Sequence, residues 1–102
     1  MGWQRAASAQ EITADKGTQV EIGDKTIALF RVDGKIYALE GICPHAEAYL
    51  AEGFIDGEKI ECPLHQAQFE IPTGKCLGPP ADRDLLAFPT KIEGDDVFVD
   101  LG

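Results

Sequence analysis

Two short segments hold the residues best suited to metal chemistry. They are Cys43-Pro44-His45 and Cys62-Pro63-Leu64-His65, and together they contain both histidines and two of the three cysteines of the chain. One tight loop can aim two side chains at one point, so Cys-x-His and Cys-x-x-His are both ligand spacings. The proline after each cysteine fixes its own φ and restrains the cysteine to an extended conformation. The pattern predicts a metal site formed by Cys43, His45, Cys62 and His65.

The ligand types narrow the choice of metal. Two thiolates and two imidazoles suit either zinc or an iron–sulfur centre. Zinc sites more often take two cysteines from one loop and two histidines from the other. Here each segment supplies one of each, which suits a two-iron cluster with two thiolates on one iron and two imidazoles on the other. A zinc site, and histidines packed beside cysteines without binding a metal, stay open as alternatives.

The alternation of ligands resembles the Rieske motif, in which two histidines replace two cysteines on one iron. The resemblance extends from residue 18 to residue 101. In respiratory-chain Rieske proteins each ligand loop carries a further cysteine, and the two form a disulfide; here those positions are Ala48 and Leu64. Those proteins also place a serine and a tyrosine hydroxyl at the cluster, where this chain has Ala67 and Phe69. The chain is therefore similar to soluble Rieske ferredoxins of bacterial aromatic-ring-hydroxylating dioxygenase systems.

The resemblance implies one Rieske 2Fe-2S cluster bound by the four ligands above, and no bond-making catalysis by the chain itself. It implies a one-electron carrier between an NAD(P)H-dependent flavin reductase and a terminal Rieske non-haem iron oxygenase that hydroxylates aromatic rings. The histidine-bearing tip, surrounded by Pro44, Pro63 and Leu64, would dock on the oxygenase. The alternatives are a small electron-input subunit of another oxidoreductase, such as nitrite reductase, and a zinc-stabilised interaction module.

The expected reduction potential follows from the ligands and their surroundings. Neutral imidazoles leave the cluster less negative than four thiolates do, which raises its potential. Ala67 and Phe69 offer no hydroxyl to stabilise the reduced cluster. We therefore expect a potential near the low end of the Rieske range, about −150 mV rather than about +300 mV. Such a value suits a carrier between a flavin and an oxygenase and does not suit oxidation of a quinol.

The length and net charge of the chain limit the number of domains and the kinds of partner it can have. A chain of 102 residues predicts a single domain, residues 1–102, with the cluster-binding part at about 40–80. The net charge of −9 argues against nucleic-acid binding and fits both solubility and electrostatic steering toward basic redox partners. Neither a signal peptide nor an apolar run of about 18 residues is visible in the sequence. We expect a cytoplasmic monomer that binds no membrane.

Short β-rich runs separated by turns predict an all-β fold, a small antiparallel sandwich or barrel with two ligand loops at one tip, as in the Rieske fold. The expected strands are residues 3–7, 18–22, 25–32, 36–39, 58–62 and 69–71, and a final hairpin of 85–92 with 97–100. Ser8 followed by Glu11 predicts one helical turn, and Asp33-Gly34 predicts a hairpin. Gly78-Pro79-Pro80 predicts a surface loop; in the resembled ferredoxins such a loop covers the cluster.

A few residues outside the motifs carry expectations of their own. We expect Trp3 to be a core or lid residue, and Tyr49, Leu50 and Phe54 to pack beneath the first ligand segment. Cys76 lies outside both segments and is interpreted as a small buried hydrophobic residue rather than a fifth ligand. The many carboxylates are expected on the solvated surface.

Overall fold

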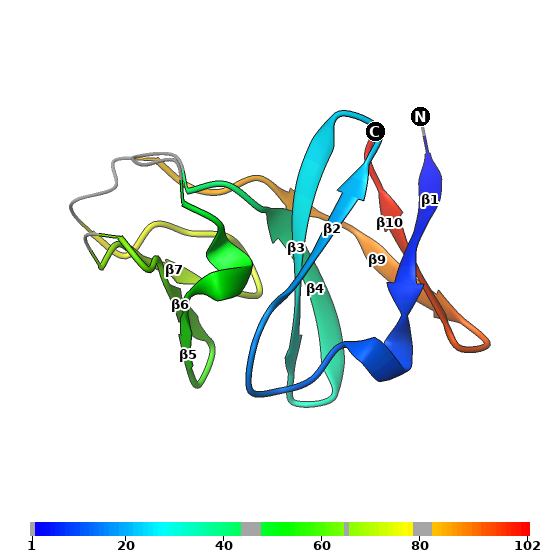
Figure 1. Ribbon diagram of the computed structural model, residues 1–102, viewed down its shortest axis with the longest axis horizontal. Coiled ribbons are helices and arrows are strands. Elements are labelled where there is room, and N and C mark those ends of the chain that lie inside the picture. The colour runs from blue at the N-terminus through cyan, green and yellow to red at the C-terminus, as the bar shows by residue number, and fades with distance from the viewer. Residues whose placement is uncertain (1, 44–47, 65, 79–82) are drawn as a thin grey trace.

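The computed structural model describes residues 2–43, 48–64, 66–78 and 83–102. In these ranges the chain forms ten strands, arranged in three antiparallel sheets, and two short 3₁₀ helices (Figure 1). The all-β prediction is confirmed. Within the same ranges, no helix has the length and apolar character needed to cross a membrane.

The first sheet joins the two ends of the chain, in the order β1 (Trp3–Ser8), β10 (Asp96–Asp100) and β9 (Thr90–Glu93). The predicted helical turn follows directly as η1 (Ala9–Glu11). It has a capping box: Ser8 Oγ accepts from the backbone of the turn, and Glu11 Oε1 accepts from Ser8 N at 3.2 Å. This turn leads the chain from the first sheet toward the second.

The middle sheet has the order β2 (Thr18–Ile22), β3 (Lys25–Val32), β4 (Lys35–Glu40) and β8 (Ala87–Phe88). Asp33 and Gly34 join β3 to β4 with φ values of 53° and 79°, the positive pair that a tight hairpin requires. Strand β3, in the interior of the sheet, is buried on both faces. Alternate residues of β3 contribute to different cores, Ile27 and Leu29 to one and Ala28 and Phe30 to the other.

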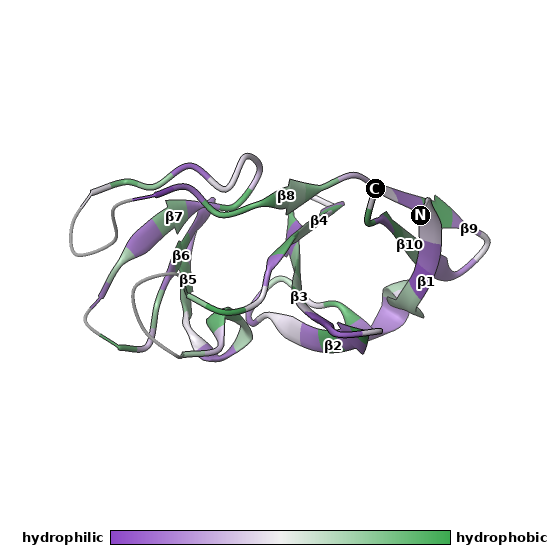
Figure 2. Ribbon diagram, turned by 90° about the horizontal axis from the view of Figure 1, so that it is seen from above, coloured by the Kyte–Doolittle hydropathy of each residue, from purple (hydrophilic) through white to green (hydrophobic). Residues whose placement is uncertain are grey.

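The third sheet lies at one end of the molecule and is formed by β5 (Phe54–Asp56), β6 (Lys59–Glu61) and β7 (Gln68–Glu70). Helix η2 (Leu50–Glu52) leads into it. From above, the three sheets follow one another along the molecule, with the middle sheet between the other two (Figure 2). The core between the second and third sheets, called here the ligand-side core, includes Phe30, Leu39, Leu50, Ile60, Phe69, Cys43 and Cys62.

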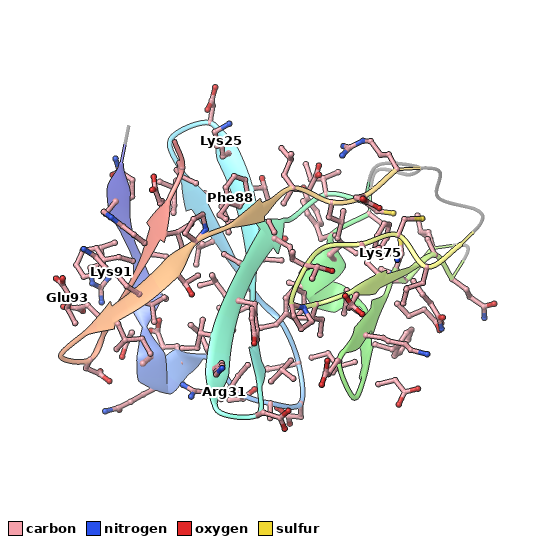
Figure 3. All side chains as sticks on the ribbon, turned by 180° about the vertical axis from the view of Figure 1, so that it is seen from behind. Lys25, Arg31, Lys75, Phe88, Lys91 and Glu93 are labelled. Atoms are coloured by element: carbon pink, nitrogen blue, oxygen red, sulfur yellow. The ribbon has the colours of Figure 1, made fainter. Side chains whose placement is uncertain are left out.

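The prediction of one strand over residues 85–92 was wrong, because the structure has two strands there. The first, β8, pairs with β4, with Ala38 opposite Phe88, whereas the second, β9, pairs with β10. Pro89 lies between the two and has no N–H to continue a ladder. The chain therefore changes sheets at this residue, and Figure 3 shows Phe88 on the middle sheet and Lys91 on the first.

Three aromatic residues expected to be packed are exposed instead. Trp3 is 41% exposed, and Lys91 Nζ lies over its ring at 4.6 Å from the centroid, so it packs against a cation on the surface. Phe54 is 65% exposed because it begins the edge strand β5. Tyr49 is exposed as well. Of the three residues expected beneath the first ligand segment, Leu50 is fully buried.

Candidate metal centre

The first ligand segment leaves the end of β4 and is closed by backbone hydrogen bonds. Cys43 N donates to Ala48 O at 2.9 Å, and Leu50 N donates to Gly41 O at 2.8 Å. Ile42 and Tyr49 face each other as an isolated antiparallel bridge. These contacts bring the two ends of the segment together like the base of a hairpin. His45, with the rest of residues 44–47, lies outside the described residues.

The second ligand segment connects β6 to β7 and is closed in the same way. Cys62 N donates to Ala67 O at 2.7 Å, so both cysteines bind the carbonyl five residues further along the chain. Gln66 has a φ of 62°, which reverses the chain direction without a glycine. His65 lies outside the described residues.

The two cysteines meet in the ligand-side core. Cys43 is 2% exposed and Cys62 is 0% exposed, and both belong to this one core. Burial raises the pKa of the Cys62 thiol to about 11; the hydrogen bond from the Leu64 backbone opposes this effect, and the adjoining Cys43 adds to it. A bound metal ion supplies the positive charge that would stabilise such buried sulfurs as thiolates.

This donor set fits one side of a metal cluster. Two buried thiols converge, and no disulfide joins them or any other pair among the three cysteines, all of which the structure describes. Within the described ranges, no group of three or more His, Cys, Asp or Glu side chains could hold a metal ion. The predicted pair Cys43 and Cys62 is thus brought together, while the contribution of His45 and His65 stays a prediction.

The surroundings of the two cysteines are apolar. Ala67 and Phe69 are both fully buried in the ligand-side core, and Ala48 is buried beside them. Cys76 is half-buried rather than buried as expected, and it packs against the same core. Its Sγ lies 3.4 Å from Gly78 O, and its backbone faces Phe69 as an isolated bridge. Pro79 and Pro80, predicted to form a surface loop, lie outside the described residues.

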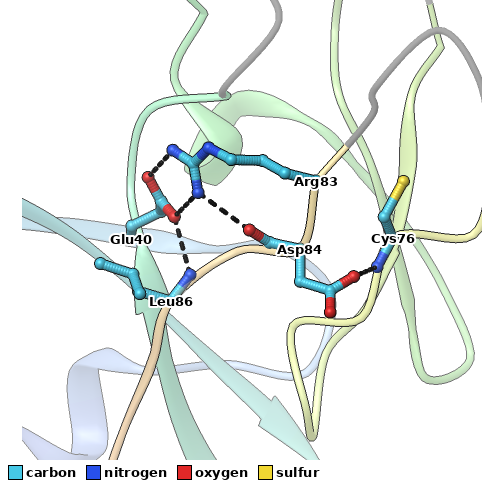
Figure 4. Close-up of polar contacts among 5 residues, drawn as sticks. All are labelled: Glu40, Cys76, Arg83, Asp84 and Leu86. Atoms are coloured by element: carbon cyan, nitrogen blue, oxygen red, sulfur yellow. Dashed lines mark hydrogen bonds and ion pairs between the residues drawn. The ribbon is translucent and has the colours of Figure 1, made fainter.

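Sequence reasoning missed a polar network beside the ligand segments. Arg83 donates to both carboxylate oxygens of Glu40 at 2.9 Å, and Leu86 N donates to Glu40 Oε1 at 2.7 Å (Figure 4). Asp84 Oδ1 accepts from Cys76 N at 2.8 Å. Glu40 and Arg83 are 43 positions apart, so no local pattern pairs them. The one available signal was the place of Glu40 at the end of a hydrophobic strand, directly before the first ligand segment.

Comparisons with known proteins agree with this site. The family model of the Rieske [2Fe-2S] domain matches residues 2–89. The ferredoxin component of the naphthalene 1,2-dioxygenase system of Pseudomonas aeruginosa is 39% identical over 97% of this chain and 95% of its own length. The structure of the Sphingomonas yanoikuyae B1 ferredoxin superposes with a TM-score of 0.92 at 28% identity, covering 97% of this chain and 98% of that one.

A second solved structure shows a relative together with an oxygenase. It is described as a complex of reduced oxygenase and oxidized ferredoxin in carbazole 1,9a-dioxygenase. The matching chain is 31% identical, has a TM-score of 0.88, and the match covers 96% of this chain and 92% of that one. The family match, the relative at 39% identity and the convergent cysteines lead to one conclusion. The chain belongs to the Rieske [2Fe-2S] domain family, and a 2Fe-2S cluster is its cofactor.

Proposed function

We propose that the chain is a one-electron carrier, the ferredoxin component of a bacterial aromatic-ring dioxygenase system. The naphthalene dioxygenase ferredoxin component, at 39% identity over nearly the whole chain, favours this role over that of a nitrite reductase subunit. When bound, the cluster supplies reversible transfer of one electron. The chain itself then has to hold the cluster, exclude water from its thiolate side and present its other side to partners.

In this proposal Cys43 and Cys62 bind one iron, and His45 and His65 bind the other. The matched closure of the two segments, each by a cysteine N–H bonded to the carbonyl five residues later, supports equivalent roles for the two cysteines. Their burial in the ligand-side core supports a thiolate side that faces the protein interior. Residues of about 40–80 then form the cluster-binding part of a single domain, residues 1–102.

Exposed apolar side chains flank the ligand segments and support a docking surface at this end. Ile42 is 42% exposed and Leu64 is 48% exposed, and each is the immediate neighbour of a ligand position. Leu77, on the segment that pairs with β7, is exposed too. We propose that this end docks on a terminal ring-hydroxylating oxygenase and that the chain receives electrons from a flavin-dependent ferredoxin reductase. The solved complex of a related ferredoxin with an oxygenase supports the first partner. A cytoplasmic monomer fits this role.

The observation that carries the proposal is the convergence of Cys43 and Cys62, both buried in the ligand-side core. The test is spectroscopy of the purified protein before and after reduction with dithionite. We expect visible absorbance that bleaches on reduction, and an EPR signal with ¹⁴N couplings from two imidazoles in pulsed experiments. Reconstitution with a reductase and an oxygenase should give ring hydroxylation that depends on the chain. A colourless protein that binds stoichiometric zinc would overturn the proposal.

A further inference from the structure

A groove of about 640 Å³ lies where the chain passes from the middle sheet to the first sheet. Its walls come from three parts of the chain: the start of β4, Pro72 in the turn after β7, and the run from Ala87 to Ile92. Figure 3 shows two of these residues, Phe88 and Lys91, on the two sheets that meet there. A hollow of this volume is large enough to hold a small molecule.

The groove exists because one edge of β4 is only partly covered. On one side β4 pairs with β3 along its whole length, but on the other side β8 pairs only with Ala38 and Leu39. At Pro89 the chain leaves this edge, and β9 continues beside β10. Within the described residues, the edge of β4 from Lys35 to Tyr37 therefore has no strand beside it.

The backbone of Ile36 presents a hydrogen-bond donor at this open edge. Ile36 O accepts from Thr90 Oγ1 at 2.7 Å, and Glu40 N donates to Leu86 O at 2.9 Å on the same side of β4. Alternate residues of a strand direct their N–H and C=O groups to the same edge, so the Ile36 N–H points there too. No carbonyl of the described chain accepts from it at this edge. A buried N–H of this kind needs a partner from water or from a ligand.

The walls of the groove are aromatic and apolar. Tyr37 and Phe88 are both half-buried, and each packs against a different core: Tyr37 against the ligand-side core, and Phe88 against the core between the first and middle sheets. Pro72 and Pro89 add two rigid apolar rings. Flat faces of this kind suit a flat aromatic ring, which stacks on them or meets them edge to face.

The charges that line the groove favour an anion. Its lining residues include two lysines and neither Asp nor Glu, although the whole chain has 18 acidic and 9 basic residues. Lys91 is already engaged, because its Nζ lies 3.2 Å from Glu93 Oε2 and over the ring of Trp3. Lys35 is exposed and directly precedes Ile36 in the sequence. It is therefore the cation placed to pair with an anion at the Ile36 N–H.

We propose that this groove binds an aromatic carboxylate, a flat apolar ring system that carries one acid group. The ring lies against Tyr37, Phe88 and Pro72, and the carboxylate accepts from Ile36 N and pairs with Lys35. A hydrogen bond to an ionised acceptor is stronger than one between neutral groups, so the acid group adds affinity as well as orientation. The site uses neither ligand segment, so it stands or falls separately from the proposed electron transfer.

The test is an NMR titration of the ¹⁵N-labelled, oxidised holoprotein with 2-naphthoate. The matched probe is 2-naphthalenemethanol, which has the same rings and no charge. Salt is kept at about 0.15 M, where the net charge of −9 is screened beyond about 8 Å. Lys35→Gln removes the proposed cation. Lys59→Gln is the control, because Lys59 is an exposed lysine of β6 that does not line the groove.

We expect saturable shifts confined to the amides of residues 34–37 and 87–92, with a dissociation constant on the order of 1 mM for 2-naphthoate. The Ile36 amide should move furthest to low field, because it donates to the carboxylate. Lys35→Gln should weaken binding about two- to fivefold, as expected for an exposed ion pair, and Lys59→Gln should match the parent protein. The alcohol should bind more weakly and leave the Ile36 amide unshifted.

Four results would overturn the proposal. Shifts that do not saturate, or that are not confined to the groove, mean that there is no site. Equal binding of the alcohol means that the acid group is not recognised, and equal losses in the two lysine variants mean a general charge effect. The fourth concerns the open edge of β4, which could also accept a strand. If an acetylated Asp-Val-Asp-Val peptide shifts the Ile36 amide and binds more tightly than 2-naphthoate, the groove takes an extended peptide instead.

Discussion

Cys43 and Cys62 are buried together in the ligand-side core, although they come from loops on two different sheets. Each loop is closed by the N–H of its cysteine, bonded to the carbonyl five residues later. The thiols are therefore positioned by backbone bonds that do not depend on the side chains between them. This arrangement allows the residues between the closing bonds to be chosen for metal binding and for docking.

The histidine ligands can be tested by exchanging the ligand type. We expect His45→Cys or His65→Cys either to lose the cluster or to convert its reduced EPR spectrum toward that of an all-thiolate cluster, with a lower potential, because thiolate donates more electron density than imidazole. Cys76→Ser is the control, since Cys76 lies outside both ligand segments, and it should keep the spectrum. An unchanged reduced spectrum in either histidine variant would contradict the assignment of that ligand.

The positions of many strands and turns along the chain could be predicted because local chemistry determines them. The positive φ values of Asp33 and Gly34 and the capping box of Ser8 are properties of a few adjacent residues. The ligand spacing is equally local. The bounds of β2 and β3 match the predicted ranges for the same reason: each run ends at a residue pair that turns the chain.

The features that were missed depend on contacts between distant residues. Pro89 could have indicated a break in its strand, but the partners of β8 and β9 follow only from the packed sheets. Arg31 donates at 2.8 Å to the carbonyls of both Ala9 and Ile12, which secures η1 against the middle sheet. Neither this contact nor the Glu40–Arg83 pair corresponds to a periodic pattern in the sequence. Trp3 was misplaced because its main partner, Lys91, is at the other end of the sequence.

The acidity of the chain predicts a salt-dependent rate of electron transfer to its partners. With a net charge of −9, association with basic partner surfaces should slow as ionic strength rises toward about 0.15 M, where the screening length is about 8 Å. Glu52, exposed in η2 near the first ligand segment, should contribute more than Glu93, which lies on the first sheet (Figure 3). Stopped-flow rates of Glu52→Gln and Glu93→Gln measure the difference. A rate that does not vary with salt leaves solubility as the reason for the charge.

Gly53 is predicted to be essential for the position of the second ligand segment. It lies between η2 and β5, and a Cβ at this position would overlap Glu61 O, one residue before Cys62. Gly53→Ala should lower the free energy of unfolding by about 1–3 kcal/mol, as overpacking does, and should hasten cluster loss. Gly57→Ala, in the same hairpin, meets open space and has a φ of 62°, so its cost is conformational, about 1–2 kcal/mol. Chemical denaturation gives both values, and equal rates of cluster loss in the two variants would contradict the role of Gly53.

The apolar surroundings of the cysteines lead to a prediction about potential. Ala67 and Phe69 are fully buried in the ligand-side core with Cys43 and Cys62. Ala67→Ser and Phe69→Tyr each add a hydroxyl, which can donate to the cluster and stabilises its reduced, more negative form. A hydrogen bond to a charged group is worth about 1.5–3 kcal/mol, and the difference between oxidation states is about a third to a half of that. Since about 59 mV corresponds to 1.4 kcal/mol for one electron, each substitution should raise the potential by about 20–60 mV.

The control for this prediction is Ala38→Ser, because Ala38 is equally small and buried but belongs to the other core. It should cost stability by burying a hydroxyl and leave the potential unchanged. With both ligand-side substitutions combined, the carrier should rise in potential relative to its oxygenase. Turnover of the reconstituted system should then slow while the cluster stays fully loaded. Potentiometry of the cluster-containing variants measures the midpoint reduction potential of each. If this potential is unshifted in Ala67→Ser, the lack of hydroxyls is not what keeps the potential low.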